Sequence, residues 1–196
     1  MSSDFFDNNS YYIDEKVNFF KFENVYQIFN DLGQNIGSIS QKLNIAEKIL
    51  RLFVGKSNLP FYLEIRDSND KLQSTISRGW TLFLSNTVIN DAYGKKIGLI
   101  QQKFRLIKPA FEIFDAFNNF IAEIKGDWRA WEFIITDSEE HKIGTVSKKW
   151  AGAVKEIFST ADKYHVTIDP NYSNKTNKIA ILSSAITIDM VLKEKE

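Results

Sequence analysis

Residues 179–192 read Ile-Ala-Ile-Leu-Ser-Ser-Ala-Ile-Thr-Ile-Asp-Met-Val-Leu, and the arrangement of the whole chain depends on this stretch. Ten of its fourteen residues are apolar, and Lys178 and Lys193 bracket it. On a helix the apolar positions extend nearly all the way round, and such a helix has to be buried on every side. The stretch is shorter than the roughly 20 residues that cross a bilayer. We therefore expect the rest of the chain to enclose it.

The same stretch is also compatible with a strand. From Ile186 to Leu192 every second residue is a large apolar one, which is the period of a β-strand. The local pattern leaves helix and strand open, so the preceding chain has to be considered.

A pattern of five positions recurs through the middle of the chain. An isoleucine is followed two residues on by Asn or Asp, eight on by Ile, nine on by Gly or Ala, and eleven on by Ile or Val. Four copies begin at Ile28, Ile89, Ile113 and Ile135. A looser copy begins at Ile65, where we expect a loop one residue shorter and Gln73 in place of the small residue.

Each copy predicts a β-hairpin. Turn-forming residues such as Asn30, Asp31 and Gly33 follow the first strand. Asn and Asp accept hydrogen bonds from their own turn, and Gly supplies a positive φ. Most copies begin 22 to 24 residues apart, which is typical of an all-β meander and shorter than the roughly 40 residues of a propeller blade.

The small residues of the second strands have two explanations. Gly37, Gly98, Ala122 and Gly144 share a face with the apolar residue two positions later. They either leave room for a helix pressed against that face or mark β-bulges and tight turns.

The remaining segments complete a barrel. We expect a strand pair over 10–22 that turns near Asp14, short helices or turns over 43–53 and 150–157, and a last strand over 164–168. Ser173, Asn174 or Thr176 could cap the helix that follows. Together these segments predict a mainly β fold. It is an antiparallel closed barrel of about twelve strands, built from repeated hairpins around a central apolar carboxy-terminal helix. We expect residues 1–9 to be poorly ordered and 10–196 to form a single domain.

Composition excludes several classes of function. Lys plus Arg and Asp plus Glu both number 25, so the chain lacks the excess of cations that nucleic-acid binding needs. Without cysteine there are no disulfides, thiolate zinc ligands or palmitoylation sites. The first residues lack the basic and apolar regions of a signal peptide, so we expect a cytoplasmic location.

Catalytic motifs are also missing. His141 and His165 are the only histidines and do not stand in a metal-binding spacing. His141 falls in a predicted turn and should be solvated, and His165 should be structural. Neither a P-loop nor a Gly-x-Ser-x-Gly motif occurs. We expect no enzyme activity, no cofactor and no metal.

The order of these features resembles the tubby C-terminal-like superfamily, especially its phospholipid-scramblase and LURP-one-related branches. The resemblance spans about 11–192 and includes an Ile188-Asp189 pair in the terminal segment. It is carried by segments 91–102 (Asp-Ala-Tyr-Gly-Lys-Lys-Ile-Gly-Leu-Ile-Gln-Gln), 111–116 (Phe-Glu-Ile-Phe-Asp-Ala), 141–152 (His-Lys-Ile-Gly-Thr-Val-Ser-Lys-Lys-Trp-Ala-Gly) and 156–164 (Glu-Ile-Phe-Ser-Thr-Ala-Asp-Lys-Tyr).

The resemblance implies a twelve-stranded barrel and a helix, not a strand, over 179–192. The residues of this helix that we expect to be buried are Ile179, Ile181, Leu182, Ala185, Ile186 and Met190. Tubby-type members bind phosphoinositide headgroups, and scramblase-type members are linked to calcium-dependent lipid movement. This chain departs from the scramblase pattern, because it has no cysteine cluster and no Pro-rich amino terminus. The segment that corresponds to the calcium site keeps only Asp162 and Asp169, whereas calcium takes six to eight oxygen ligands.

Basic residues are the site candidates. Lys148 and Lys149 precede Trp150, and Lys103 and Arg105 form a second group. Cations beside an aromatic residue suit an anionic lipid surface. The alternative is that Trp150 packs in the core and the lysines only keep the surface soluble. The other tryptophans, Trp80, Trp128 and Trp131, are expected in core or rim packing.

These observations predict a non-enzymatic domain that binds an anionic lipid headgroup or a membrane-bound partner, located in the cytoplasm and peripherally at a membrane. The alternative is a soluble scaffold that binds proteins and has no affinity for lipid. An active phospholipid scramblase fits less well, because the apolar stretch is short and contains Asp189.

Overall fold

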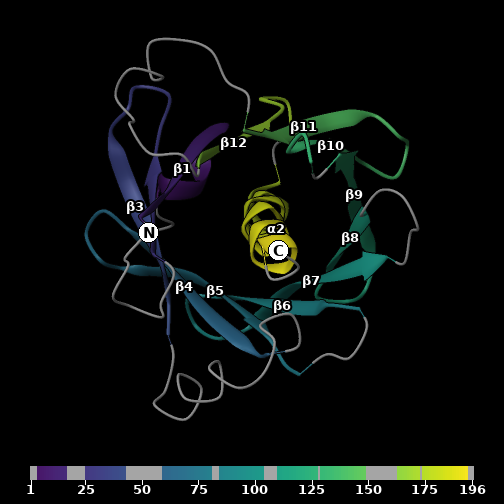
Figure 1. The fold of residues 1–196 in the computed structure, drawn as a ribbon, viewed down its shortest axis with the longest axis horizontal. Coiled ribbons are helices and arrows are strands. Elements are labelled where there is room, and N and C mark those ends of the chain that lie inside the picture. The colour runs from purple at the N-terminus through teal and green to yellow at the C-terminus, as the bar shows by residue number, and fades with distance from the viewer. Residues whose placement is uncertain are drawn as a thin grey trace.

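A computed structural model of the chain shows a closed barrel of twelve antiparallel strands around one long helix (Figure 1). It describes residues 4–16, 25–42, 59–80, 84–103, 110–127, 129–148, 163–172 and 174–193. The predicted fold class, a mainly β barrel around a carboxy-terminal helix, is confirmed.

The strands follow one another around the barrel in chain order. They are β1 (Ser10–Lys16), β2 (Val25–Phe29), β3 (Asn35–Gln41), β4 (Phe61–Asp67), β5 (Leu72–Arg78), β6 (Asn86–Asp91), β7 (Lys96–Lys103), β8 (Ala110–Asp115), β9 (Phe120–Asp127), β10 (Glu132–Thr136), β11 (Lys142–Ser147) and β12 (Lys163–Ile168). Because β1 pairs with both β2 and β12, the described strands leave no edge open to another chain.

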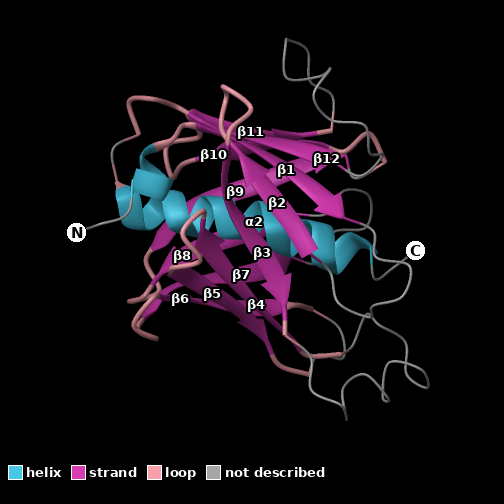
Figure 2. Cartoon of the chain, turned by 90° about the vertical axis from the view of Figure 1, so that its left-hand side faces the viewer, coloured by secondary structure: helices cyan, strands magenta, loops and turns pink. Residues whose placement is uncertain are grey.

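The helix α2 (Lys175–Lys193) lies along the barrel axis (Figure 2). Asn174 caps it by accepting a hydrogen bond from the Asn177 N–H at 3.1 Å, which agrees with one of the predicted caps. The helix lies in the core as expected, with Ile179 partly buried and five further residues fully enclosed: Ile181, Leu182, Ala185, Ile186 and Met190. The hydroxyls of Ser184 and Thr187 donate to the carbonyls of Ala180 and Ser183, so burial leaves these two hydroxyls bonded.

All five copies of the repeat form hairpins with the same turn. The ladder shifts by one residue directly after the repeat isoleucine, which faces the residue nine positions later. The next Asn or Asp accepts hydrogen bonds from the backbone N–H groups two and four positions on. The residue three positions after it has a positive φ in every copy, at Gly33, Asp70, Gly94, Asn118 and Glu140. This is the three-residue hairpin loop with an αL bulge.

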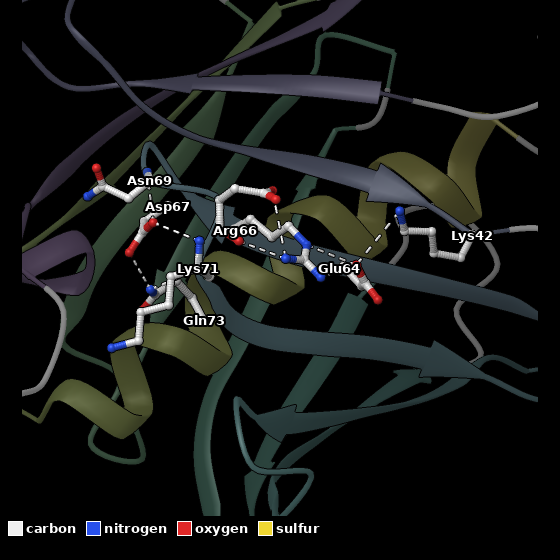
Figure 3. Close-up of polar contacts among 8 residues, drawn as sticks. Lys42, Glu64, Arg66, Asp67, Asn69, Lys71 and Gln73 are labelled. Carbon is white, nitrogen blue, oxygen red and sulfur yellow. Dashed lines mark hydrogen bonds and ion pairs between the residues drawn. The ribbon is translucent and has the colours of Figure 1, made fainter.

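The copy that begins at Ile65 has the same loop length as the others, which corrects the expected shorter loop. Ser74, not Gln73, faces Ile65 and supplies the small residue. Gln73 stands where other copies have Ile, and its amide donates to the Asp67 carboxylate at 2.7 Å and to the Lys71 carbonyl at 3.2 Å (Figure 3). Because Gln73 is polar where the other copies have an apolar residue, the sequence pattern alone placed this copy one residue out of register.

The five turns lie at one end of the barrel, which we call the turn end, and α2 begins there. The opposite end, where α2 ends and where β3, β5, β7, β9 and β11 end, is the loop end (Figure 2). At the turn end the Lys178 ammonium donates to the Asn9 side chain at 2.7 Å, and Lys175 pairs with Asp7. These contacts attach the amino-terminal segment to the helix.

Close approach of a neighbouring strand accounts for two of the small residues, Gly37 and Gly144. A Cβ at Gly37 would lie 2.3 Å from the Arg66 carbonyl oxygen, and one at Gly144 would lie 2.3 Å from that of Thr167. Both oxygens belong to a neighbouring strand. Only Gly98 faces the helix, with Ala180 Cβ 3.5 Å from its added Cβ. Glycine is therefore needed at Gly37 and Gly144 because neighbouring strands approach closely there, and not mainly to leave room for α2.

Three other expectations differ from the structure or lie outside it. β1 runs through Asp14 without a turn, because β2 and β12 pair with it on either side. Residues 1–9 were expected to be poorly ordered, whereas the 3-10 helix η1 (Asp4–Asp7) buries Phe5 and Phe6 in the core. The last strand is confirmed as β12. The helices or turns expected over 43–53 and 150–157 lie outside the described residues.

Gly144→Ala should destabilise the barrel, because its Cβ would meet the backbone of β12. Overpacking of this kind costs about 1–3 kcal/mol, and we expect a loss of that size in the free energy of unfolding from urea titration. Gly79→Ala is the control, since nothing lies within 4 Å of its added Cβ, and its change should stay within about 0.5 kcal/mol. Equal losses in both variants would contradict the packing argument.

Candidate functional site

A lysine lies over a tryptophan ring at the loop end. The Lys148 Nζ atom is 4.3 Å from the centroid of Trp131, and the Lys148 backbone N–H donates to the Trp131 carbonyl at 3.0 Å. Trp131 precedes β10 and is buried in the core, which agrees with the expected packing. Attraction between a cation and an aromatic face strengthens as water is excluded. The predicted candidate Lys148 is therefore held against the barrel interior.

Ring contacts continue from Trp131 to the helix. Trp131 stacks on Tyr164 at 6.0 Å between ring centroids, and Tyr164 meets Tyr26 edge-on at 6.5 Å. The Tyr26 hydroxyl then donates to the Asp189 carboxylate at 2.9 Å. A row of contacts thus connects a cation at the loop end with a carboxylate enclosed in the barrel. Asp189, which counts against a membrane-crossing helix, has a hydrogen-bonding role inside the barrel.

Arg78 forms a second contact between a cation and an aromatic ring at the same end. It is the last residue of β5 and is 4% exposed, with its Cζ atom 4.6 Å from the centroid of the Phe61 ring. Its guanidinium donates to the Leu59 carbonyl at 2.6 Å. Ladder alternation places Arg78 on the same face of β5 as the core residue Ile76. Its charge is therefore directed toward the interior of the barrel.

Buried polar side chains collect beside Arg78. Thr87 is its ladder partner, and the Thr87 hydroxyl lies 3.4 Å from that of Ser85. The Ser85 N–H donates to the Gln102 side chain at 3.3 Å. Gln41, the last residue of β3, is also fully buried. The interior of the barrel is thus polar near the loop end, in contrast with the aliphatic core further in.

Three lysines, here called the rim lysines, surround this end from outside. They form ion pairs with glutamates on the same or a neighbouring strand, in the pairs Lys42–Glu64 at 3.8 Å, Lys103–Glu112 at 3.0 Å and Lys125–Glu123 at 2.5 Å. The strand register places every lysine two positions nearer the loop end than its glutamate. Figure 3 shows the first pair. Exposed pairs contribute about 0–1 kcal/mol, so their main consequence is that positive charge projects furthest at this end.

The turn end carries carboxylates instead. An Asp begins four of the five hairpin turns: Asp67, Asp91, Asp115 and Asp137. The hydrogen bond from the Asn119 side chain lowers the pKa of Asp115 below its ordinary value. These aspartates also accept hydrogen bonds from the backbone N–H groups of their own turns. The two ends of the barrel therefore present different charges.

His165 lies on the outer face of β12, opposite to the face that carries Tyr164. Its Nε2 atom is 2.7 Å from the Ser10 hydroxyl, and its ring stacks on Tyr12 with centroids 4.1 Å apart. Burial lowers the pKa of His165 below its ordinary value, so the ring is neutral at pH 7. Cross-strand stacking fits the predicted structural role. Among the described residues, no three His, Cys, Asp or Glu side chains are grouped so as to hold a metal ion.

The predicted lipid candidates are only partly brought together. Lys103 and Lys148 both lie at the loop end, but β8, β9 and β10 separate their strands around the barrel. Lys149, Trp150 and Arg105 lie outside the described residues. Sequence reasoning missed Arg78, although a charge in line with Ser74 and Ile76 on one strand face was a usable signal. Trp80 was expected in core or rim packing, but it is 64% exposed.

The closed barrel around a buried terminal helix defines the class of the protein as a tubby-like barrel. The chain belongs to the scramblase family, whose sequence model matches residues 14–195. Within the part of the chain that the structure describes, no helix has the length and hydrophobicity needed to cross a membrane.

Curated relatives carry the same family name. The chain is 27% identical to a phospholipid scramblase family protein of Schizosaccharomyces pombe over 72% of this chain and 39% of that protein. It is 24% identical to human phospholipid scramblase 2 over 90% of this chain and 62% of the relative. It is 27% identical to human phospholipid scramblase family member 5 over 87% of this chain and 66% of that relative. The chain thus spans between about two fifths and two thirds of the length of these relatives. No solved structure matches the chain.

Tyr26→Phe should lower stability, because it removes the hydroxyl that donates to the buried Asp189 carboxylate. Loss of a hydrogen bond to a buried group costs about 1–3 kcal/mol, measurable as a lower free energy of unfolding in urea. Tyr93→Phe is the matched control, since Tyr93 is exposed at a turn. Unchanged stability in Tyr26→Phe would show that this hydrogen bond contributes nothing.

Acid should destabilise the fold partly through His165. Its folded pKa is lowered, so as pH falls from about 6.5 the unfolded chain binds a proton before the folded chain does. The free energy of unfolding therefore declines from that pH down to the folded pKa of His165. Below the folded pKa, the contribution of His165 to stability no longer changes with pH. We expect His165→Gln to lose less stability than the unchanged protein between pH 7.5 and pH 5.5 in urea titrations. Identical slopes in the unchanged protein and in His165→Gln would refute the assignment.

Proposed function

We propose that this chain is a non-enzymatic domain that binds the headgroup of an anionic phospholipid at its loop end. The observation that carries the proposal is the pair of cations on aromatic faces, Lys148 on Trp131 and Arg78 on Phe61, at the end where buried polar side chains collect. The curated relatives are phospholipid scramblases by name, which supports a lipid as the ligand.

The chemistry of these groups suits a phosphate. Arginine presents a planar fork that matches phosphate oxygens, and charge-assisted hydrogen bonds are stronger than neutral ones. Arg78 and Lys148 are partly shielded from water by Phe61 and Trp131, which reduces the loss of hydration on binding. The rim lysines would add longer-range attraction to an anionic surface, at roughly 1 kcal/mol for each cation near it.

This proposal places the protein in the cytoplasm, peripherally at a membrane that it contacts from the aqueous side. A soluble scaffold without lipid affinity is the second candidate. The observation in its favour is that every rim lysine already has a glutamate partner. Vesicle binding by a Lys148 variant distinguishes the two candidates, because Lys148 lies over Trp131 at the proposed site.

Lys148→Ala should weaken binding to vesicles of phosphatidylcholine with phosphatidylserine by about fivefold, the equivalent of about 1 kcal/mol for one cation. The measurement is flotation of purified protein at two salt concentrations, in calcium and in a chelator. Binding should fall with salt and should not depend on calcium.

Lys142→Ala is the matched control, because Lys142 begins the same strand, β11, at the turn end. Its binding should equal that of the unchanged protein. If the unchanged protein floats with neither neutral nor anionic vesicles at either salt concentration, the lipid proposal fails and the scaffold candidate replaces it. Equal weakening by both variants would place the site elsewhere.

A further inference from the structure

Apolar side chains are exposed beside the site at the loop end. Trp80, two residues after Arg78, is 64% exposed, and Leu84, just before β6, is 39% exposed. The sequence between them is Thr-Leu-Phe. A tryptophan this exposed is unusual, because its ring is among the largest apolar groups in a protein. Tryptophan is enriched where membranes meet water, since its body is apolar and its N–H can stay hydrated.

We propose that Trp80 and Leu84 enter the headgroup region of an anionic membrane, so that the loop end of the barrel faces the bilayer. This orientation rests on the proposed function and adds to it the surface that makes contact. Arg78 holds the start of the connection in place, because its guanidinium is bound to the Leu59 carbonyl and covered by Phe61. Entry of Trp80 would bring Arg78 toward the level of the lipid phosphates.

The turn end offers a competing surface. Tyr93 and Phe117 are 95% and 83% exposed at the tips of neighbouring hairpins. Their turns, however, are built on Asp91 and Asp115, whose carboxylates hold the tip residues by accepting their N–H groups. Lys96 lies beside these turns, and its charge favours the ionised form of Asp115. Carboxylates in the turns oppose approach to anionic lipid.

Charge at the loop end favours such approach. The rim lysines lie nearer that end than their glutamate partners, so within each pair the ammonium group lies nearer to a membrane that approaches there. Apolar insertion and cationic attraction then act at one surface, the combination that gives stable interfacial binding. The geometry therefore selects the loop end over the turn end.

Site-specific labels can test the orientation directly, because the chain contains no cysteine. Trp80→Cys and Phe117→Cys would each carry one environment-sensitive nitrobenzoxadiazole label, in full-length protein that is otherwise unchanged. With vesicles of phosphatidylcholine and phosphatidylserine, the label at position 80 should shift to the blue and be quenched by brominated acyl chains. The label at position 117 should do neither.

Unlabelled variants provide a second readout that does not depend on the label. Trp80→Ala should lower the partition coefficient on the same vesicles by about tenfold, as expected for loss of a large buried apolar group. The binding that remains should fall more steeply with salt, because the apolar part is gone. Phe117→Ala should bind as the unchanged protein does, and near-ultraviolet circular dichroism should show that both variants are folded.

Three results would overturn the orientation. If the protein floats with anionic vesicles but the label at 117 responds and that at 80 does not, the turn end makes contact, and lipid binding itself survives. If flotation persists and neither label responds, contact is made without insertion of either end. If the unchanged protein does not float at all, both this orientation and the proposed function fail.

Discussion

Enclosure of α2 is the constraint on which the rest of the structure depends. The helix is apolar on almost every side, so a single layer of sheet has to surround it completely. Closure by pairing of β1 with both β2 and β12 accomplishes this and removes exposed edges at the same time. Three buried polar residues of α2 form hydrogen bonds within this enclosure, Ser184 and Thr187 to the helix backbone and Asp189 with Tyr26.

The hairpin repeat makes the two ends of the barrel different. Every copy places an Asn or Asp, followed by a left-handed residue, at the turn end, because the bulged turn requires both. The second strands then end at the opposite side with cations such as Lys103 and Arg78. The turn end thus carries the turn aspartates together with lysines such as Lys96 and Lys142, and the loop end carries cations that lie beyond their glutamate partners. Local turn chemistry thus has a consequence at the scale of the whole domain.

Much of the candidate site could not be found by inspecting motifs. Lys148 was predicted because it stands beside a tryptophan in sequence, yet the ring under its ammonium group is Trp131, seventeen positions earlier. Arg78 was not among the predicted candidates, and its contact with the Phe61 ring became visible only with β4 and β5 paired. Trp80 was expected to pack, but it is exposed. Hydrophobicity alone cannot tell whether a surface for packing is within reach of a side chain.

The order of hairpins, their turns and the all-round apolar character of α2 follow from the sequence by itself, because period, turn residues and hydrophobicity are local properties. Even there the Ile65 copy was misaligned, since Gln73 occupies an apolar position. The contacts that define the site depend on tertiary structure, because they join residues that closure of the barrel brings together. Tyr26 meets Asp189 across 163 positions of the chain, and no local pattern encodes that pairing. Long-range packing selects which polar side chains are enclosed and which cations project at the loop end.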